Sequence, residues 1–295
     1  MRKLLFIINP ISGGINKSGL RKSISRCCGQ EGIEYTFMET CGNEDDLLIK
    51  NKIEDYQPTA VIACGGDGTV NLVAQQLHGR EISLGIMPLG SANGLATELD
   101  IPEEINKALR VIVENKVIKM DILQINDQHI CLHLSDIGFN AKLIKRFEKS
   151  SYRGKLGYAT HFFETLIKKK QLLYKFEYEE ETFDQKAEMV VFANARKYGT
   201  GAIVNPIGKV NDRKFEVCIF KPYPWYAIFR LAYLFFIGKL NYSPFVKIFS
   251  TRSVTVSSDK SEHLQIDGES IGKFKRVVVK LSEHQLPVIV PQAWS

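Results

Sequence analysis

The sequence predicts an α/β fold in two parts: a mostly parallel sheet with helices on both faces, then a mainly antiparallel β domain. Up to residue 118, apolar runs of strand length alternate with amphipathic helical patterns, and such strand–loop–helix units build a parallel sheet. From residue 119 onward, β-rich runs are separated by turns, as in an antiparallel sheet. Because no low-complexity linker lies between the two parts, we expect two closely joined domains.

The first part contains the signals for four strands and four helices. The expected strands are residues 3–8, 35–39, 60–64 and 82–87, and the expected helices are residues 19–31, 44–55, 70–77 and one that begins at Pro102. Two glutamates follow Pro102, and proline and acidic side chains favour the first turn of a helix. The run from Met1 to Ile8 breaks at Asn9-Pro10, too early for a signal peptide, and therefore predicts a first strand.

The bulk composition favours a globular protein with an anionic ligand. Of 295 residues, 44% are hydrophobic and 24% are charged, and the net charge of +6 suits an anionic substrate or an anionic lipid surface. No basic stripe with interleaved aromatic residues is present, so we expect no nucleic-acid partner. The six cysteines form no C-x-x-C pair, which argues against a zinc knuckle, and scattered thiols indicate a reducing, cytoplasmic location.

A glycine-rich turn follows the third apolar run. This run starts at Ala60 and ends in Gly65-Gly66-Asp67-Gly68-Thr69, and a helical pattern begins at Val70. Open α/β sheets bind ligands at such strand-to-helix turns, where backbone N–H groups and the positive helix end attract anions. Asp67 would repel a bare phosphate, so it fits a metal ion or a proton transfer. The alternative interpretation is a tight turn without a ligand.

Two other loops rich in glycine, serine and asparagine also follow predicted strands. They are Asn9–Gly14 and Pro88–Gly94. Because the carboxyl ends of parallel strands lie at one edge of a sheet, the three loops are expected to cluster there. This clustering indicates phosphate binding more strongly than any loop does alone.

The second part reads as strands with one aromatic segment. A hairpin around Asn126-Asp127-Gln128 and a helical section at 141–170 are expected, with further strands at 173–179, 186–194, 215–221, 252–257 and 276–281. The aromatic segment, Pro222–Val246, is too short to span a bilayer. It predicts either an amphipathic helix packed on the sheet, an apolar wall for an acyl chain, or a face that rests on a membrane. Arg230, Lys239 and Lys247 would favour anionic headgroups.

Five motifs in order carry a family resemblance over nearly the whole chain. They are Asn9-Pro10-x-Ser12-Gly13, Gly65-Gly66-Asp67-Gly68-Thr69, Pro88-Leu89-Gly90-Ser91-x-Asn93, Tyr198-Gly199-Thr200-Gly201 and Ile266-Asp267-Gly268-Glu269. The chain thereby resembles the diacylglycerol kinase catalytic family, which includes YegS-like bacterial lipid kinases and sphingosine and ceramide kinases. The run Leu286–Pro291 is similar to the closing strand of this family, which returns to the first domain.

The resemblance implies a Rossmann-like, phosphofructokinase-like nucleotide domain followed by a β-sandwich domain that receives the lipid. The expected domains are residues 1–118, rejoined by 285–295, and residues 119–284. It also implies an ATP-dependent lipid kinase whose active site lies between the domains and whose acceptor is the hydroxyl of a diacylglycerol or a sphingoid lipid. Lipid metabolism, including phospholipid biosynthesis, and peripheral association with a membrane surface are the expected setting. The oligomeric state is left open, a homodimer included.

The same resemblance assigns the site residues. The residues implied to contact the nucleotide are Asn9, Thr40, Gly65, Gly66, Asp67, Gly68, Thr69, Val70, Asn71 and Ser91. The acidic pair Asp267 and Glu269 is implied to hold the catalytic base that takes the proton of the lipid hydroxyl, with Glu269 preferred and Asp67 a third candidate. Asn9 and Ser12 could equally be turn residues, and Asp-Gly-Glu alone would indicate a surface turn.

Magnesium is implied at two places. One ion is expected to bridge the nucleotide phosphates and the site carboxylates. A second, structural ion is implied at Asp212, although Arg213 stands where the family has a glycine, and arginine disfavours the positive φ that glycine allows.

Other departures leave the substrate open. Leu72 replaces a glutamate of many members, and Gly90-Ser91-Ala92-Asn93 resembles the sphingosine kinase version of its loop. An NAD kinase-like enzyme and a catalytically weak lipid- or nucleotide-binding protein remain alternatives.

Overall fold

The structure is a computed structural model that describes residues 2–14, 19–138, 171–198 and 202–294. The chain divides into two compact units. One contains Met1–Met120 and His284–Ser295, and the other contains Asp121–Glu283. The expected helical section at residues 141–170 lies outside the described residues.

The first unit is built on a six-stranded sheet with the order β2-β1-β3-β4-β18-β5. These strands are β2 (Glu34–Glu39), β1 (Lys3–Ile8), β3 (Ala60–Gly65), β4 (Ser83–Pro88), β18 (Leu286–Val290) and β5 (Lys116–Met120). Neighbouring strands are parallel except β18 and β5, which pair antiparallel. The predicted parallel sheet is therefore confirmed, and the late strand β18 lies inside it.

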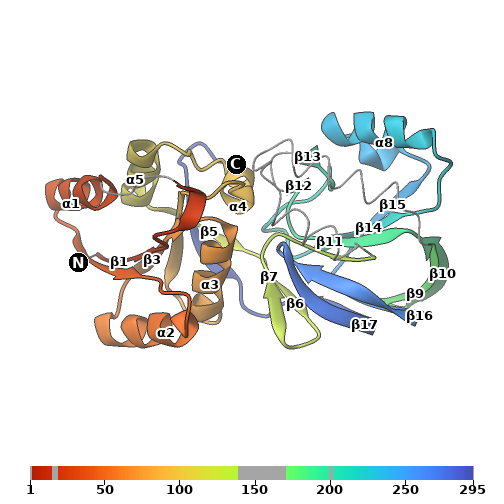
Figure 1. Cartoon of the computed structure of the whole chain (residues 1–295), viewed down its shortest axis with the longest axis horizontal. Helices are drawn as coiled ribbons and strands as arrows, with labels where there is room; N and C mark the ends of the chain where they lie inside the picture. The colour runs from red at the N-terminus through yellow and green to blue at the C-terminus, as the bar shows by residue number, and fades with distance from the viewer. Residues whose placement is uncertain (1, 15–18, 139–170, 199–201, 295) are drawn as a thin grey trace. The chain divides into compact units, whose positions relative to one another are not determined.

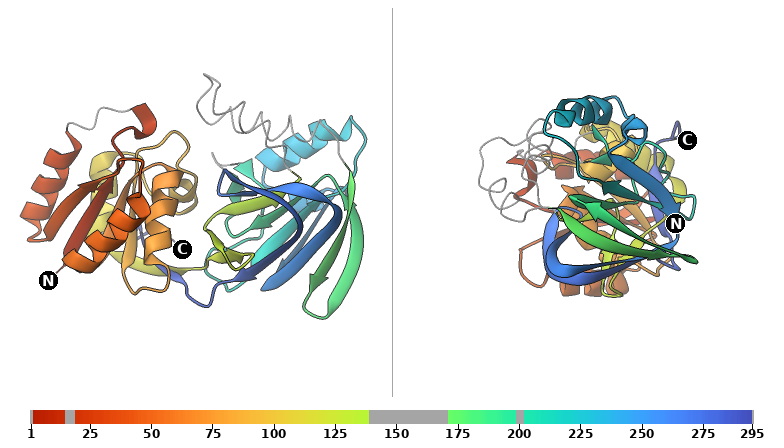
Figure 2. Two further views of the ribbon diagram at one scale, coloured as in Figure 1. Left: turned by 60° about the horizontal axis from the view of Figure 1, so that its bottom comes forward. Right: turned by 90° about the vertical axis from the view of Figure 1, so that its right-hand side faces the viewer.

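Helices cover both faces of this sheet. They are α1 (Leu20–Gln30), α2 (Asp45–Tyr56), α3 (Asp67–Leu77), the short α4 (Gly94–Glu98) and α5 (Ile105–Glu114), with a 3-10 turn η1 at Ser12–Gly14. Figures 1 and 2 show α1 and α5 together on one face and α2 and α3 on the other. Because side chains of a strand alternate between faces, Leu4, Phe6 and Ile8 of β1 reach the core under α1 and α5.

Two helix ends test the sequence signals. Gly79 stops α3 as expected, since it has a φ of 77° just beyond the last helical residue, Leu77. Helix α5 begins at Ile105 rather than Pro102, because Glu104 has extended backbone and serves as the N-cap. The proline and the first glutamate thus belong to the bend that leads into the helix.

The second unit is mainly antiparallel sheet, as predicted. Its main sheet contains β6 (Leu123–Ile125), β7 (His129–Cys131), β8 (Leu134–Ile137), β9 (Leu172–Tyr178), β10 (Glu181–Ala187), β11 (Met189–Ala193), β14 (Phe215–Phe220), β15 (Val246–Thr251), β16 (Ser253–Ile266) and β17 (Glu269–Leu281). A separate ribbon joins β12 (Lys197–Tyr198) to β13 (Ala202–Ile203). Strands β16 and β17 form a long hairpin that extends well beyond the two short strands expected there.

Two cores stabilise this unit. One buries aromatic and β-branched side chains of most strands, among them Phe176, Phe192 and Phe215. The other lies on the opposite face of β11 and β14, where the helix α8 (Ala227–Phe236) packs, followed by the 3-10 turn η2 (Leu240–Tyr242). The prediction that this segment forms a helix packed on the sheet is therefore confirmed for α8, although its outer face is aromatic rather than polar.

Candidate active site

In the first unit, the predicted site residues lie at the carboxyl edge of the sheet. In the order β2-β1-β3-β4, the chain passes from β1 to β2 toward one edge of the sheet and from β3 to β4 toward the other. The loops after β1 and β3 therefore flank a topological switch point, where open α/β sheets bind ligands. Strand β3 ends at Gly65, Gly66 is extended at φ −93° and ψ −171°, and α3 starts at Asp67. The first backbone N–H groups of α3 and its positive dipole end are therefore presented at this edge.

Glycines bring the three loops of this edge into backbone contact. A Cβ atom on Gly90 would lie 2.3 Å from the Cα of Gly66, so the loops after β3 and β4 touch where neither has a side chain. A Cβ atom on Gly13, which has a φ of 66°, would lie 2.1 Å from the carbonyl oxygen of Leu89. The predicted clustering of the loops is thus present, and it depends on glycine at these positions.

Polar side chains fasten the same loops. The Nδ2 of Asn9 donates to the Oγ1 of Thr69 over 3.2 Å. The side chain of buried Asn93 accepts from the backbone N–H of Gly90 at 2.8 Å and donates to the carbonyl of the same residue at 3.1 Å. Asn9 therefore links the loop after β1 to the start of α3, and Asn93 fixes the loop after β4 internally.

Asp67 has both carboxylate oxygens engaged by backbone. Its Oδ2 accepts from the N–H of Gly94 at 2.9 Å, and its Oδ1 accepts from the N–H of Leu95 at 3.2 Å. These two amides open the short helix α4, so the aspartate ties the start of α3 to the loop after β4. The carboxylate that the sequence singled out for a metal or a proton transfer is here a link between two loops.

The other predicted nucleotide residues lie in different environments around this edge. Thr40 follows β2 and donates its backbone N–H to the carbonyl of Ile8. Ser91 and Gly68 are exposed, whereas Gly65, Thr69 and Val70 are buried. The Oδ1 of Asn71 is buried and has no hydrogen-bond partner within the described ranges. An unsatisfied polar atom beside glycine loops fits a site that receives a polar ligand.

A second group of predicted site residues, in the second unit, lies at the turn of the β16–β17 hairpin. Ile266 pairs with Glu269, and the two residues between them, Asp267 and Gly268, have φ values of 47° and 94°. Two successive residues with positive φ are typical of a type I′ turn, for which Asp-Gly is a preferred sequence. Asp267 and Glu269 therefore flank a tight turn, which differs from two residues on one side of an extended strand.

Asp267 is fixed by a set of backbone amides. Its Oδ1 accepts from the N–H groups of His133 at 2.9 Å and Leu134 at 3.1 Å, and its Oδ2 accepts from that of Leu132 at 2.8 Å. Burial raises the pKa of Asp267, and the N–H bonds oppose this rise. The residue anchors the hairpin turn to the segment between β7 and β8.

Glu269 stands apart from Asp267 in exposure. The structure places it on the solvent side of the turn, as the first residue of β17. A carboxylate of this kind is free to meet a substrate hydroxyl, whereas that of Asp267 is already saturated by amide donors.

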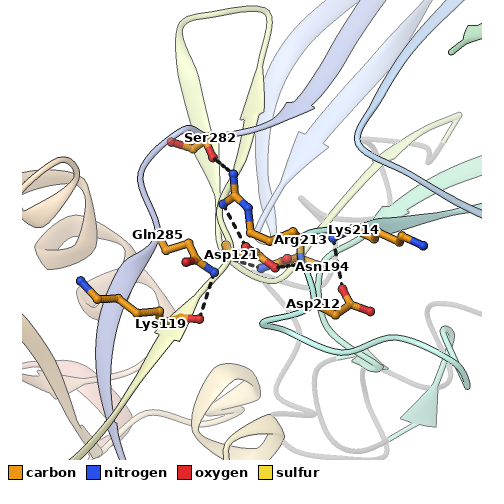
Figure 3. Close-up of polar contacts among 8 residues, drawn as sticks. All are labelled: Lys119, Asp121, Asn194, Asp212, Arg213, Lys214, Ser282 and Gln285. Atoms are coloured by element: carbon orange, nitrogen blue, oxygen red, sulfur yellow. Dashed lines mark hydrogen bonds and ion pairs between the residues drawn. The ribbon is translucent and has the colours of Figure 1, made fainter.

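A third acid, which the sequence did not single out, lies near the expected metal position (Figure 3). Asp121 is completely buried, and its Oδ2 accepts from the backbone N–H of Arg213 at 2.7 Å. The guanidinium of Arg213 reaches the Oδ1 of Asp121 at 3.1 Å and the carbonyl of Ser282 at 3.1 Å. A lone acid at the start of an apolar run was the only signal for Asp121 in the sequence.

The residues around Asp212 do not fit a structural magnesium ion. Asp212 is exposed and accepts from the backbone N–H of Lys214, as in an Asx turn. Arg213 adopts the left-handed conformation, with a φ of 62°, and puts a positive guanidinium beside the buried carboxylate of Asp121. No group of three or more His, Cys, Asp or Glu side chains in the described ranges is placed to hold a metal. The magnesium ion expected at Asp212 stays a prediction, and the described side chains provide no group of ligands that supports it.

One predicted motif, Tyr198–Gly201, lies only partly within the described residues. Gly199, Thr200 and Gly201 lie outside the described residues. Leu72 is half-buried on α3. Over the part of the chain that the structure describes, no helix has the length and apolar character to cross a bilayer.

Comparison with known proteins gives a consistent result for both units. Residues 3–125 match the diacylglycerol kinase catalytic domain, and residues 135–293 match the YegS C-terminal NAD kinase beta sandwich-like domain. The chain is 29% identical over 223 residues to a Citrobacter koseri protein named "Probable lipid kinase YegS-like", with 73% of each chain covered. It is 29% identical over 198 residues to the lipid kinase YegS of Escherichia coli K12, covering 65% of this chain and 66% of the other.

Solved structures share the fold. A diacylglycerol kinase crystal structure from Bacillus anthracis superposes with a TM-score of 0.77 at 19% identity, covering 100% of this chain and 98% of the other. An NAD kinase from Archaeoglobus fulgidus in complex with ATP gives a TM-score of 0.56 at 14% identity, with 99% and 94% covered. At these identities the likeness concerns the fold alone.

Proposed function

Because the chain belongs to the lipid kinase family defined by the diacylglycerol kinase catalytic domain and the YegS C-terminal domain, we propose that it transfers the terminal phosphate of ATP to a lipid hydroxyl. The observation that carries the proposal is the glycine-lined edge of the first sheet, where Gly13, Gly66 and Gly90 bring three loops together. Phosphoryl transfer asks a protein chiefly for positioning and charge stabilisation. Preformed amide-rich loops at a helix N-terminus provide both for a triphosphate.

The first unit supplies nucleotide binding in this proposal. The start of α3 offers N–H groups to the phosphates, and Asn71 offers an unsatisfied oxygen nearby. Asp67 keeps the loops in place through its bonds to Gly94 and Leu95. ATP is expected to enter as its magnesium complex, since Mg²⁺ neutralises phosphate charge during transfer. Asp67 and Glu269 are the carboxylates that are candidates to hold the ion.

The second unit supplies the general base. Glu269 is preferred because its carboxylate is exposed, whereas four donors, three of them backbone amides, occupy that of Asp267. Asp267 instead positions Glu269 by fixing the turn that precedes it. The proposal requires Glu269 to reach a hydroxyl beside the nucleotide, so the reaction is placed between the two units.

The acceptor is proposed to be a diacylglycerol or a sphingoid lipid. Radiolabelled ATP offered with a panel of diacylglycerol, ceramide and sphingosine in mixed micelles, and separately with NAD, tests this directly. Phosphorylation of a lipid and not of NAD supports the proposal. Phosphorylation of NAD alone would replace it by an NAD kinase, whose fold the chain shares. Nucleotide binding without turnover on any acceptor would indicate a catalytically weak binding protein.

A further inference from the structure

The outer face of α8 carries aromatic side chains where a surface helix usually carries polar ones. Between residues 225 and 242 the structure exposes six large aromatic side chains: Trp225, Tyr226, Phe229, Tyr233, Phe236 and Tyr242. Trp225 is 74% exposed and Phe229 is 71% exposed. Single exposed apolar residues are ordinary, but a contiguous group of this size marks an interaction surface.

The two faces of α8 are both apolar, for different reasons. Ala227, Leu231 and Leu234 are buried against the sheet and hold the helix in place. Phe229 and Tyr233 lie four residues apart on α8, and Trp225 precedes the helix by two residues; these three exposed side chains, outside that core, form an aromatic stripe. Figure 1 shows α8 beyond β14 and β15, with this unit's sheet on only one side of it. Among the described residues of the second unit, the stripe therefore takes no part in the core beneath α8.

The charge of the surrounding chain is of one sign. No aspartate or glutamate occurs from residue 217 to residue 258, whereas five lysines and arginines do. Two of them, Arg230 and Lys239, are exposed on α8 and just after it. Lys247 does not belong to this surface, because its Nζ lies 3.6 Å from the ring centre of Phe183 on the other face of the sheet.

We propose that this surface, which we call the α8 face and define as Trp225, Tyr226, Phe229, Arg230, Tyr233, Lys239 and Tyr242, rests on an anionic lipid bilayer. Tryptophan and tyrosine favour the boundary between headgroups and acyl chains, because their rings are apolar and their N–H and O–H groups are polar. Arg230 and Lys239 then meet lipid phosphates. The surface would bring the proposed kinase to its substrate, and in that respect alone it rests on the proposed function.

A second copy of the chain is a less suitable occupant. In a symmetric dimer the same patch faces itself, so Arg230 and Lys239 would meet their own copies. The segment offers no carboxylate to compensate that repulsion. An anionic bilayer supplies the missing negative charge at every position.

Tryptophan fluorescence tests the contact at a single residue. The chain has two tryptophans, so Trp294→Phe leaves Trp225 as the only reporter. With vesicles that contain phosphatidylglycerol, we expect a blue shift of its emission and quenching by lipids brominated on the acyl chains. Phosphatidylcholine vesicles should give little change, and added salt should weaken the response. An emission spectrum unchanged by phosphatidylglycerol vesicles would overturn the proposal.

Sedimentation with the same vesicles, without ATP, measures the whole surface. Trp225→Ala with Phe229→Ala should lower the partition coefficient at least about tenfold, since two interfacial aromatic anchors are lost. Leu173→Ala, which removes a half-exposed leucine of β9, is the matched control and should bind as the unchanged chain does. Arg230→Gln should weaken binding only to phosphatidylglycerol vesicles. Equal binding by the double variant and the control would contradict the proposal. It would also be contradicted if the unchanged chain bound no vesicles and formed a dimer that the double substitution converts to a monomer.

The readouts separate this inference from the proposed function. Vesicle binding without phosphorylation of any lipid would refute the kinase and leave the surface intact. Phosphorylation of lipid by the double variant at an unchanged rate in vesicles would refute the surface and leave the kinase intact. A rate that falls in vesicles but not with a water-soluble short-chain acceptor is the result expected when both hold.

Discussion

The two Asp-Gly pairs of the molecule, one in each unit, look alike in sequence and differ in structure. Asp67 and Asp267 each bind backbone N–H groups of a neighbouring loop through both carboxylate oxygens. After Asp67 the chain enters a helix whose positive end suits a phosphate, whereas after Asp267 it reverses in a hairpin that exposes Glu269. The comparison shows that a motif acid can be a structural clamp while the chemistry depends on what the clamp presents.

The largest effect is expected for Glu269→Gln, which removes the exposed carboxylate that follows the Asp267 turn. We expect kcat for lipid phosphorylation to fall by about 10²- to 10⁴-fold, because the proposed general base is lost. The melting temperature and the affinity for magnesium-free ATP should stay the same, since the side chain is exposed. Ser270→Ala, the next exposed residue, is the control and should keep its activity. Full activity of Glu269→Gln would show that the base lies elsewhere.

Asp121 extends the comparison to an acid held by a cation. Arg213→Ala should destabilise the second unit by about 2–4 kcal/mol, because Asp121 is completely buried and would lose its guanidinium partner. Urea unfolding measures the change. Arg213→Gly loses the same partner but relieves the strained φ of 62°.

Added magnesium tests whether an ion can bind beside Asp121 and Arg213. The melting temperature of the unchanged chain should not respond to Mg²⁺, since the guanidinium already neutralises Asp121. If Mg²⁺ stabilises both the unchanged chain and Arg213→Gly, then the ion binds beside the arginine. The guanidinium of Arg213 would then not take the place of an ion at Asp121.

Asp267→Asn and Asp67→Asn test the two clamps directly. An asparagine NH₂ group in place of a carboxylate oxygen would face an N–H donor, so each change should cost about 1–3 kcal/mol of folding free energy. Both variants should also lose lipid phosphorylation, through a displaced Glu269 in the first and a displaced glycine loop in the second. ATP binding, measured by calorimetry, should fall only in Asp67→Asn. Weaker ATP binding in Asp267→Asn would contradict the separation of roles.

The smallest expected effect distinguishes the two glycines. Gly268→Ala should destabilise the chain by about 1 kcal/mol, because the residue has a φ of 94°. Gly68→Ala should not destabilise it, since Gly68 lies in α3 and a Cβ atom there meets nothing within 4 Å. Thermal unfolding of the two variants measures the difference. A loss of ATP binding in Gly68→Ala at full stability would indicate that the nucleotide approaches this residue closely.

The sequence was informative where local periodicity decides the structure. The strand–turn–helix unit around Gly66 follows from an apolar run, glycines and an i, i+3, i+4 pattern, and strand, turn and helix are all present. Helix α3 begins at Asp67, three residues before the expected Val70, because Gly66 rather than Thr69 is its N-cap. The fold class followed in the same way. The long β16–β17 hairpin was underestimated because its middle is polar, with residues such as Asp259 and Lys260, and shows no regular alternation.

The site was less predictable than the fold. Sequence could point to Asp67 and Asp267 as acids, but their hydrogen bonds go to amides 27 to 28 and 133 to 135 positions away, which no local pattern specifies. Arg213 was recognised as a departure, yet its partner Asp121 lies 92 positions earlier in the chain. Long-range pairing of this kind is decided by tertiary packing.

Strand β18 gives the first unit an unusual dependence on the order of synthesis. It lies between β4 and β5, so the sheet that carries the glycine loops has a gap until residues 286–290 leave the ribosome. Until then β4 is an open edge and β5 has no neighbour. The second unit, whose strands are all complete by residue 281, can fold earlier. The proposed nucleotide binding is therefore expected only after these residues have emerged.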